Sequence, residues 1–178
     1  MKKGVFQGVI AILLAALALF ALSFALKGVA ERNAEAVKLH TFRALLPGSS
    51  TFEAEPYTGE DTSIRSVCKG ETGFVVEVTT AGYADEITML VGVSSDGSVT
   101  GLVVKDMHET WGLGMKALTD WRYLAQYLHT TGDAQIGTDV DALTGATVTS
   151  KAITRCVNSA VAVVTGTDAE SSATSWGG

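Results

Sequence analysis

An uncharged apolar run near the start of the chain is the feature that most constrains its fold. From Gly4 to Leu26 no residue carries a formal charge, and apart from glycine only Gln7 and Ser23 are not apolar. At 1.5 Å per residue a helix of this length spans about 33 Å, which is enough to cross the hydrocarbon core of a bilayer with a modest tilt. The run predicts one transmembrane helix, and residues 1–29 are expected to form an N-terminal anchor.

The residues that flank this run predict its orientation. A pair of lysines precedes it, whereas Lys27, which follows, is soon joined by Glu31 and Glu35. The positive-inside rule then places the N-terminus in the cytoplasm and the later residues outside the cell or inner membrane. A signal peptide cleaved near Ser23-Phe24-Ala25 is the alternative. Its apolar region is normally only about 7–15 residues long, so the single-pass anchor is favoured.

From residue 30 onward the chain is acidic, because ten basic residues stand against nineteen acidic ones and leave a formal charge of −9. Nucleic acid and anionic lipid headgroups both require a basic surface, so this charge argues against either as a partner. About 150 residues are enough for one domain with a hydrophobic core.

The two cysteines do not form a metal-binding pattern. The sequence has no CxxC pair and no cluster of histidine and cysteine at metal-ligand spacing, so we expect no metal site in this chain. Outside the cytoplasm Cys68 and Cys156 could form a disulfide. Cys156, however, lies on the apolar stripe of a predicted helix, where cysteine usually behaves as a small buried hydrophobic residue. Two free thiols are therefore the favoured expectation.

The centre of the chain is rich in residues that favour strands. Four stretches are predicted to be strands: Ile64–Lys69, Gly73–Thr80, Ile87–Val93 and Val99–Val104. The last two are joined by Ser94–Ser98, whose Asp96-Gly97 pair is typical of a hairpin turn. A helix is expected from about Asp120 to His129, capped by Thr119 or Asp120, and the apolar residues between Ala152 and Val164 predict a final helix.

These elements predict an α+β fold in which an antiparallel sheet packs against helices and is preceded by one transmembrane helix. Ala30–Leu46 has helical composition and is expected to continue the membrane helix or to kink from it. Pro47-Gly48 ends it, and Ser49–Ser63 is interpreted as a loop. The predicted divisions after the anchor are a helix and loop at 30–63, an extracytoplasmic domain at 64–165 and a flexible tail at 166–178.

A hydroxyl-rich turn precedes the final helix. It has the sequence Asp141-Ala142-Leu143-Thr144-Gly145-Ala146-Thr147 and is followed by Val148-Thr149-Ser150, where Thr149 or Ser150 is placed to cap the helix. The small Gly145 and Ala146 leave the backbone accessible to a second protein. No histidine or lysine adjoins Thr147, so an outside enzyme would have to activate its hydroxyl. A phosphate there would lie near the helix start, which favours an anion. The alternative is an ordinary polar turn with a helix cap.

A second loop connects the last predicted strand to the first helix after the sheet. Asp106–Met115 holds two glycines, a histidine and an acid within ten residues. It is either a functional loop or an ordinary connection with a solvated His108 and with Trp111 and Met115 in the core.

The turn that ends at Thr147 resembles the acceptor site at which a flavin transferase esterifies FMN through its phosphate to a threonine. With the second loop, the chain resembles the G subunit of the Rnf ion-translocating ferredoxin:NAD⁺ oxidoreductase complex, and more distantly the C subunit of the Na⁺-translocating NADH:quinone reductase. The resemblance covers most of the chain, including Gly82-Tyr83 and the Asp96-Gly97 hairpin. The sequence departs from the family pattern at Trp111, where proline is commoner, and at Ala84-Asp85-Glu86, where smaller residues are usual.

The resemblance implies that FMN is bound covalently to Thr147 by a phosphoester, and that Asp141 belongs to the sequence recognised by a Mg²⁺-dependent flavin transferase. The other FMN-binding residues that it implies are Thr144, Gly145, Ala146, His108, Glu109, Thr110, Gly112, Leu113 and Gly114. It also implies an α+β domain outside the membrane. The chain would be an electron-transfer component of a membrane oxidoreductase with other subunits as partners, and it would have no catalytic residue and no substrate site of its own.

Three alternatives stay open at the level of sequence. The first is the C subunit of a Na⁺-translocating NADH:quinone reductase. The second is an FMN domain that serves an extracytoplasmic reductase with a soluble acceptor, and the third is a flavin-free anchored binding or sensor module. A single helix without buried ionisable residues forms no ion pathway, so any ion transport is expected in partner subunits.

Overall fold

The computed structural model describes residues 2–166 and separates into two units, Met1–His40 and Thr41–Gly178. The first unit is formed by helix α1, Lys2–Leu45, which extends into the second. Of the two alternatives for Ala30–Leu46, the structure shows continuation of the first helix as far as Leu45. By length and composition alone α1 could cross a membrane, a property that a signal sequence shares. The predicted tail from residue 167 onward lies outside the described residues.

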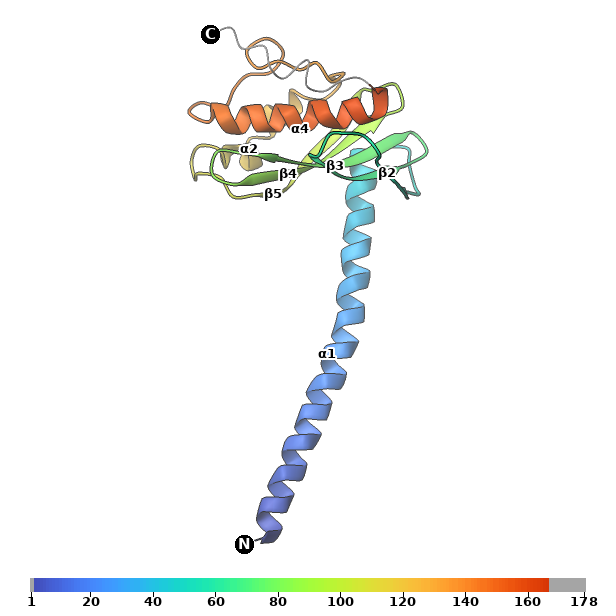
Figure 1. Ribbon diagram of the computed structural model, residues 1–178, viewed down its shortest axis with the longest axis vertical. Coiled ribbons are helices and arrows are strands. Elements are labelled where there is room, and N and C mark those ends of the chain that lie inside the picture. The colour runs from blue at the N-terminus through green and yellow to red at the C-terminus, as the bar shows by residue number, and fades with distance from the viewer. Residues whose placement is uncertain (1, 167–178) are drawn as a thin grey trace. The chain divides into compact units, whose positions relative to one another are not determined.

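The second unit is built on a five-stranded antiparallel sheet in the order β1-β2-β3-β4-β5 (Figure 1). The strands are β1 Glu53–Glu55, β2 Ile64–Lys69, β3 Gly73–Ala81, β4 Glu86–Ser94 and β5 Val99–Met107. Strands that are adjacent in sequence are also adjacent in the sheet. The four predicted strands are confirmed, and so is the hairpin, in which Gly97 has a φ of +87°.

Strand β1 was not predicted, and the interpretation of Ser49–Ser63 as a loop throughout is wrong. The three residues of β1 are all exposed, and they pair with Val67, Cys68 and Lys69 at the edge of the sheet. The sequence Glu-Ala-Glu has neither β-branched residues nor apolar alternation. Its extended conformation therefore depends on the neighbouring strand and leaves no local signal.

The helices of the second unit also depart from the sequence expectation in part. They are α2 Lys116–Thr119, α3 Trp121–Ala125 and α4 Thr147–Thr165. The predicted helix from Asp120 to His129 is wrong in length, because α3 ends at Ala125 and is followed by turns that lead to His129, whose φ is +68°. Its predicted cap is confirmed, since the Asp120 carboxylate accepts a hydrogen bond from Arg122 N at 3.1 Å.

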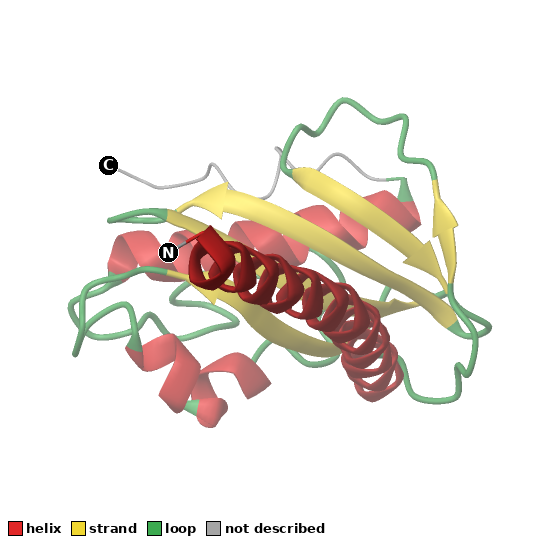
Figure 2. Cartoon of the chain, turned by 90° about the horizontal axis from the view of Figure 1, so that it is seen from below, coloured by secondary structure: helices red, strands yellow, loops and turns green. Residues whose placement is uncertain are grey.

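Helix α4 covers one face of the sheet, here called the inner face, and encloses the main hydrophobic core (Figures 1 and 2). Alternate residues of β3 and β4 point into this core, including the buried Val76, Val78 and Val91. From the helix, Ile153 and Val157 meet them and are fully buried. Each fully buried valine or isoleucine contributes roughly 1.5–3 kcal/mol to the free energy of folding relative to an exposed one. The packing of α4 on the sheet therefore contributes strongly to the stability of the domain.

The opposite, outer face of the sheet has a smaller apolar cluster. Phe42, Leu45 and Leu46 pack there with Val75 and Leu90. Gly92 of β4 and Gly101 of β5 pair directly across the strands, and both lie against the backbone of Leu45. Thr100 Oγ1 donates a hydrogen bond of 2.6 Å to the Leu45 carbonyl. The missing side chains at the glycine pair therefore admit the main chain of Leu45.

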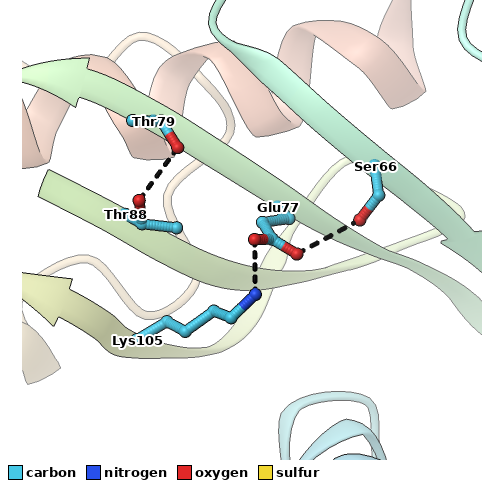
Figure 3. A network of polar contacts seen from close by, with 5 residues as sticks. All are labelled: Ser66, Glu77, Thr79, Thr88 and Lys105. Atoms are coloured by element: carbon cyan, nitrogen blue, oxygen red, sulfur yellow. Dashed lines mark hydrogen bonds and ion pairs between the residues drawn. The ribbon is translucent and has the colours of Figure 1, made fainter. Parts of the chain in front are cut away.

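Another part of the outer face carries polar contacts (Figure 3). Lys105 Nζ lies 2.6 Å from Glu77 Oε1, and Ser66 donates a hydrogen bond to Glu77 Oε2 at 3.4 Å. The hydroxyl groups of Thr79 on β3 and Thr88 on β4 lie 2.9 Å apart in a hydrogen bond. Because ion pairs accessible to solvent contribute little stability, these contacts mark a solvated part of the sheet.

Both cysteines are free and buried, and they lie on opposite faces of the sheet. Cys68 belongs to the outer cluster, whereas Cys156 on α4 belongs to the inner core. Burial raises the pKa of the Cys156 thiol to about 11, although Thr80 Oγ1 lies only 3.2 Å from its sulfur. The structure thus favours two free thiols over the disulfide alternative.

We expect neither cysteine to react with iodoacetamide at pH 8 in the folded protein, because the thiolate is the nucleophile and both thiols are buried. After denaturation without reductant, both should be alkylated. Burial of Cys156 favours its neutral thiol and raises its pKa from 9.0 to about 11. The contribution of this burial to the free energy of unfolding is therefore fully present below pH 9 and is lost as the pH rises through about 11. Intact mass measures the labelling, and an added label on native protein would contradict the burial.

Gly92→Ala should destabilise the domain by roughly 1–3 kcal/mol, because the new methyl group would collide with the Leu45 carbonyl oxygen. Chemical denaturation of the full chain in micelles, followed by tryptophan fluorescence, measures this change. Gly28→Ala is the control, since a Cβ at that helical position meets no atom within 4 Å. Equal stability of the two variants would show that Leu45 does not rest on β4.

Candidate functional site

Three segments that are far apart in the sequence meet beside the N-terminal end of α4. They are the β3–β4 turn at residues 82–85, the loop 108–114 that follows β5, and the turn 144–147. The side chain of Glu109 contacts the first segment and the start of α4, and Leu113 lies against Gly145. The two loops singled out in the sequence are thus brought together in the fold.

Glu109 makes the polar contacts that join these segments. Its Oε1 accepts hydrogen bonds from Tyr83 N at 2.7 Å and from Ala84 N at 3.2 Å. Its Oε2 accepts one from Thr149 Oγ1 at 3.1 Å. Because a carboxylate accepts charge-assisted hydrogen bonds, one side chain connects a strand turn, a loop and a helix.

Thr147 is exposed and is the first residue of α4. The first intrahelical hydrogen bond here runs from Ser150 N to the Ala146 carbonyl at 2.9 Å. Over residues 2–166 the structure gives no acceptor to the N–H groups of Thr147, Val148 and Thr149. Free N–H groups and the positive end of the helix dipole favour an anion at this position.

The expectation that Thr149 or Ser150 caps the helix is wrong. The helix starts two residues earlier than Thr149, after Ala146, which has no polar side chain. Thr149 instead donates its hydroxyl to Glu109, while Ser150 Oγ accepts from Leu143 N at 2.9 Å and donates to the Ala146 carbonyl at 3.0 Å. Ser150 therefore connects both ends of the turn that precedes α4.

The turn itself relies on glycine. Gly145 has a φ of +76°, a conformation that L-residues with a side chain rarely adopt. A Cβ at this position would lie 3.0 Å from Leu113 Cδ2. Thr144 is exposed and Ala146 is buried, with Ala146 N donating to the Leu143 carbonyl at 2.9 Å.

The other residues predicted in the loop 108–114 differ in their surroundings. His108 is exposed, and its Nδ1 lies 3.5 Å from Asp106 Oδ1. The Thr110 carbonyl accepts from Leu113 N at 3.2 Å, and Gly112 has a φ of +79° with open space around it. Gly114 is buried against Glu109 and Thr149. The loop thus anchors at Glu109 and Gly114 and exposes the residues between them.

The alternative that placed Trp111 and Met115 in the core is wrong for the first and right for the second. Trp111 is 84 % exposed, whereas Met115 packs against the main core cluster. Tyr83, in the turn joined to Glu109, is 72 % exposed. Two large aromatic side chains therefore stand in solvent on segments that border the start of α4.

Asp141 lies outside these contacts. Its side chain is exposed, and only its backbone N–H is engaged, donating to Gln126 Oε1 at 2.9 Å. Within residues 2–166 no group of three or more histidine, cysteine, aspartate or glutamate side chains is arranged to hold a metal ion.

A buried network of hydroxyl groups connects the first turn of α4 to the core. This network was not predicted from the sequence. Tyr123 and Tyr127 join their hydroxyl groups at 3.0 Å, and Tyr127 meets Thr154 Oγ1 at 2.7 Å. Thr154 in turn donates to the Ser150 carbonyl at 3.0 Å. Burial raises the pKa of Tyr127, so the phenol stays neutral. The four-residue spacing of the tyrosines, which brings both to one side of a helical turn, is the sequence signal that could have revealed it.

Comparison with known proteins shows which family has this arrangement. Residues 82–162 match the FMN-binding domain, a stretch that contains every predicted site residue. The G subunit of the Na⁺-translocating ferredoxin:NAD⁺ oxidoreductase complex of Acetobacterium woodii is 36 % identical over 100 residues, which cover 51 % of this chain and 48 % of that protein. The G subunit of the ion-translocating oxidoreductase complex of Methanosarcina acetivorans is 33 % identical over 148 residues, 74 % of either chain. The chain belongs to the G-subunit family of ion-translocating oxidoreductase complexes.

The match to these G subunits varies in extent. The alignment covers 53 % of the G subunit of the proton-translocating ferredoxin:NAD⁺ oxidoreductase complex of Clostridium ljungdahlii, at 36 % identity over 99 residues. The chain thus spans about half the length of the first curated relatives that it matches. The names of these relatives include both Na⁺ and proton translocation, so they do not select the ion.

Ser150→Ala should destabilise this G-subunit domain by about 1–3 kcal/mol, because it leaves the buried Leu143 N–H without its acceptor. Urea denaturation followed by near-ultraviolet circular dichroism measures the change. Ser95→Ala is the matched control, because that hydroxyl bonds to the Thr72 carbonyl in an exposed position. A loss no larger than that of the control would contradict the support of the turn by Ser150.

Proposed function

We propose that this chain is a membrane-anchored electron-transfer subunit of an ion-translocating oxidoreductase and that it carries FMN esterified through its phosphate to Thr147. The observation that carries the proposal is the exposed hydroxyl of Thr147 at the uncapped start of α4, within the stretch that matches the FMN-binding domain. The G-subunit relatives support a role inside a multisubunit redox complex.

The residues at the site fit a phosphoester of FMN. The unpaired N–H groups of residues 147–149 are suited to phosphate oxygens. Gly145 and the exposed Thr144 leave the hydroxyl of Thr147 open to a second protein. The residues that flank Thr147 in the sequence, Ala146 and Val148, cannot take a proton from its hydroxyl, which supports attachment by a separate flavin transferase rather than self-modification.

Bound FMN would supply one- and two-electron transfer, and the protein would bind it and orient it. Thr147 would hold the phosphate end. The loop 108–114, with Leu113 against Gly145, would border the flavin, and the exposed Trp111 of this loop and Tyr83 of the β3–β4 turn offer aromatic surface on two segments of the site. In this proposal electrons would arrive from and leave to partner subunits.

Attachment also fits the proposed location. With the N-terminus in the cytoplasm and the domain outside, a dissociated flavin would be diluted, whereas a covalent link keeps its local concentration high. Asp141 is exposed on the approach to the turn and is accessible to a transferase. The ion pathway would belong to partner subunits, because α1 alone forms none.

Flavin fluorescence should remain with the polypeptide on a denaturing gel, and Thr147→Ala should abolish it. Intact mass of the protein from its own membrane should exceed the sequence mass by one FMN less one water. Ser95→Ala is the control, because it removes an exposed hydroxyl from the β4–β5 hairpin, outside the site, and should retain the flavin. Protein without added mass would favour a flavin-free module, and fluorescence that persists in Thr147→Ala would move the attachment elsewhere.

A further inference from the structure

We propose that Glu109 is a positioning residue that holds the acceptor turn in place for flavin attachment, rather than a group that contacts the flavin. This inference rests on the proposed attachment at Thr147. The family resemblance implies instead that Glu109 is one of the FMN-binding residues. The geometry assigns it a different task, because both of its carboxylate oxygens are occupied by donors of the protein itself.

The first support is the way in which the contacts are divided. Oε1 receives two consecutive backbone N–H groups, those of Tyr83 and Ala84, from the β3–β4 turn. Oε2 receives the hydroxyl of Thr149, two residues beyond Thr147 in the first turn of α4. A carboxylate accepts all three hydrogen bonds without a competing donor of its own. Glu109 therefore fixes the distance between the strand turn and the helix start.

The second support is independent of these hydrogen bonds and comes from two glycines. A Cβ on Gly82 would collide with Glu109 Oε1. A Cβ on Gly114 would lie 2.9 Å from both Glu109 Cβ and Oε2, and 2.7 Å from Thr149 Oγ1. Gly82 and Gly114 thus both lie against the Glu109 side chain. The absence of a Cβ at these two positions leaves the space that the carboxylate occupies.

The loop that carries Glu109 also contacts the acceptor turn directly. Leu113 packs against Gly145, two residues before Thr147, while Glu109 holds Thr149, two residues after it. Both sides of the acceptor threonine are therefore restrained by one loop. When only a fraction of the conformers can react with an enzyme, the apparent rate is the rate of the reactive conformers multiplied by that fraction. Release of the loop would accordingly slow the flavin transferase.

The experiment compares Glu109→Ala, Glu109→Gln, Thr149→Val and the double variant Glu109→Ala/Thr149→Val, all as full chains in micelles. The first measurement is hydrogen exchange of the Tyr83 and Ala84 amides in protein without flavin. The second is the initial rate of flavin addition by a purified flavin transferase, followed by intact mass. Glu77→Gln is the control, because that carboxylate also connects separate segments, through Lys105 and Ser66, but lies on the outer face of the sheet.

Glu109→Ala should speed exchange of the two amides by about tenfold or more, because they lose a charged acceptor, and should slow flavin addition severalfold. Glu109→Gln should retain most of both properties, since its amide oxygen accepts from the turn and its amide group can donate to Thr149 Oγ1. Thr149→Val should slow addition less than Glu109→Ala. The double variant should be no slower than Glu109→Ala, because both changes break one connected unit.

Unchanged exchange at Tyr83 and Ala84 in Glu109→Ala would overturn the proposal, and so would an unchanged rate of flavin addition. If Glu109→Ala unfolds, Thr149→Val decides, and addition at the wild-type rate in that variant overturns the inference. Wild-type protein that takes up no flavin contradicts the proposed function itself. Wild-type protein that is modified beside an equally fast Glu109→Ala contradicts the positioning role alone.

Discussion

The packing of α4 on the inner face of the sheet is the interaction on which the rest of the domain depends. Ile153, Cys156 and Val157 are fully buried against β3 and β4. Thr80 Oγ1 adds a hydrogen bond of 3.1 Å to the Ala152 carbonyl, which fixes the helix along its axis. Because protein interiors are close-packed, a shift of α4 would open voids along the whole interface. This packing therefore places Thr147, at the start of the helix, relative to the strand turn and the loop beside it.

In the candidate site, regular elements of the fold position the loops that carry the site residues. The strands and α4 form a rigid scaffold, and the residues proposed to bind the flavin lie on or beside the connections between these elements. Glu109 joins these connections on the solvent side, while Ser150 and the tyrosine network join the acceptor turn to the core below. The site is thus restrained from two directions, although most of its members are exposed.

The fold was predictable where local patterns are strong. Strands β3 and β4 carry β-branched residues on both faces, of which α4 buries one and Phe42, Leu45 and Leu46 bury part of the other. Helix α3 was predicted but has only five residues. The missed elements, β1 and α2, have weak local patterns, because β1 is three residues at an exposed edge and α2 has four residues. Such short segments are held by their neighbours, so propensity summed along the chain does not reveal them.

The sequence by itself determined the apolar helix α1, the positions of strands β2 to β5, and the two loops that carry glycines and hydroxyl groups, because each depends on residues close together in the chain. Only the tertiary structure decided that Thr149 serves Glu109 and not the helix cap, and that Cys68 and Cys156 lie on opposite faces. Hydrogen bonds between residues 26 and 40 positions apart leave no periodicity in a sequence. They form only after the sheet and α4 have brought their donors and acceptors together.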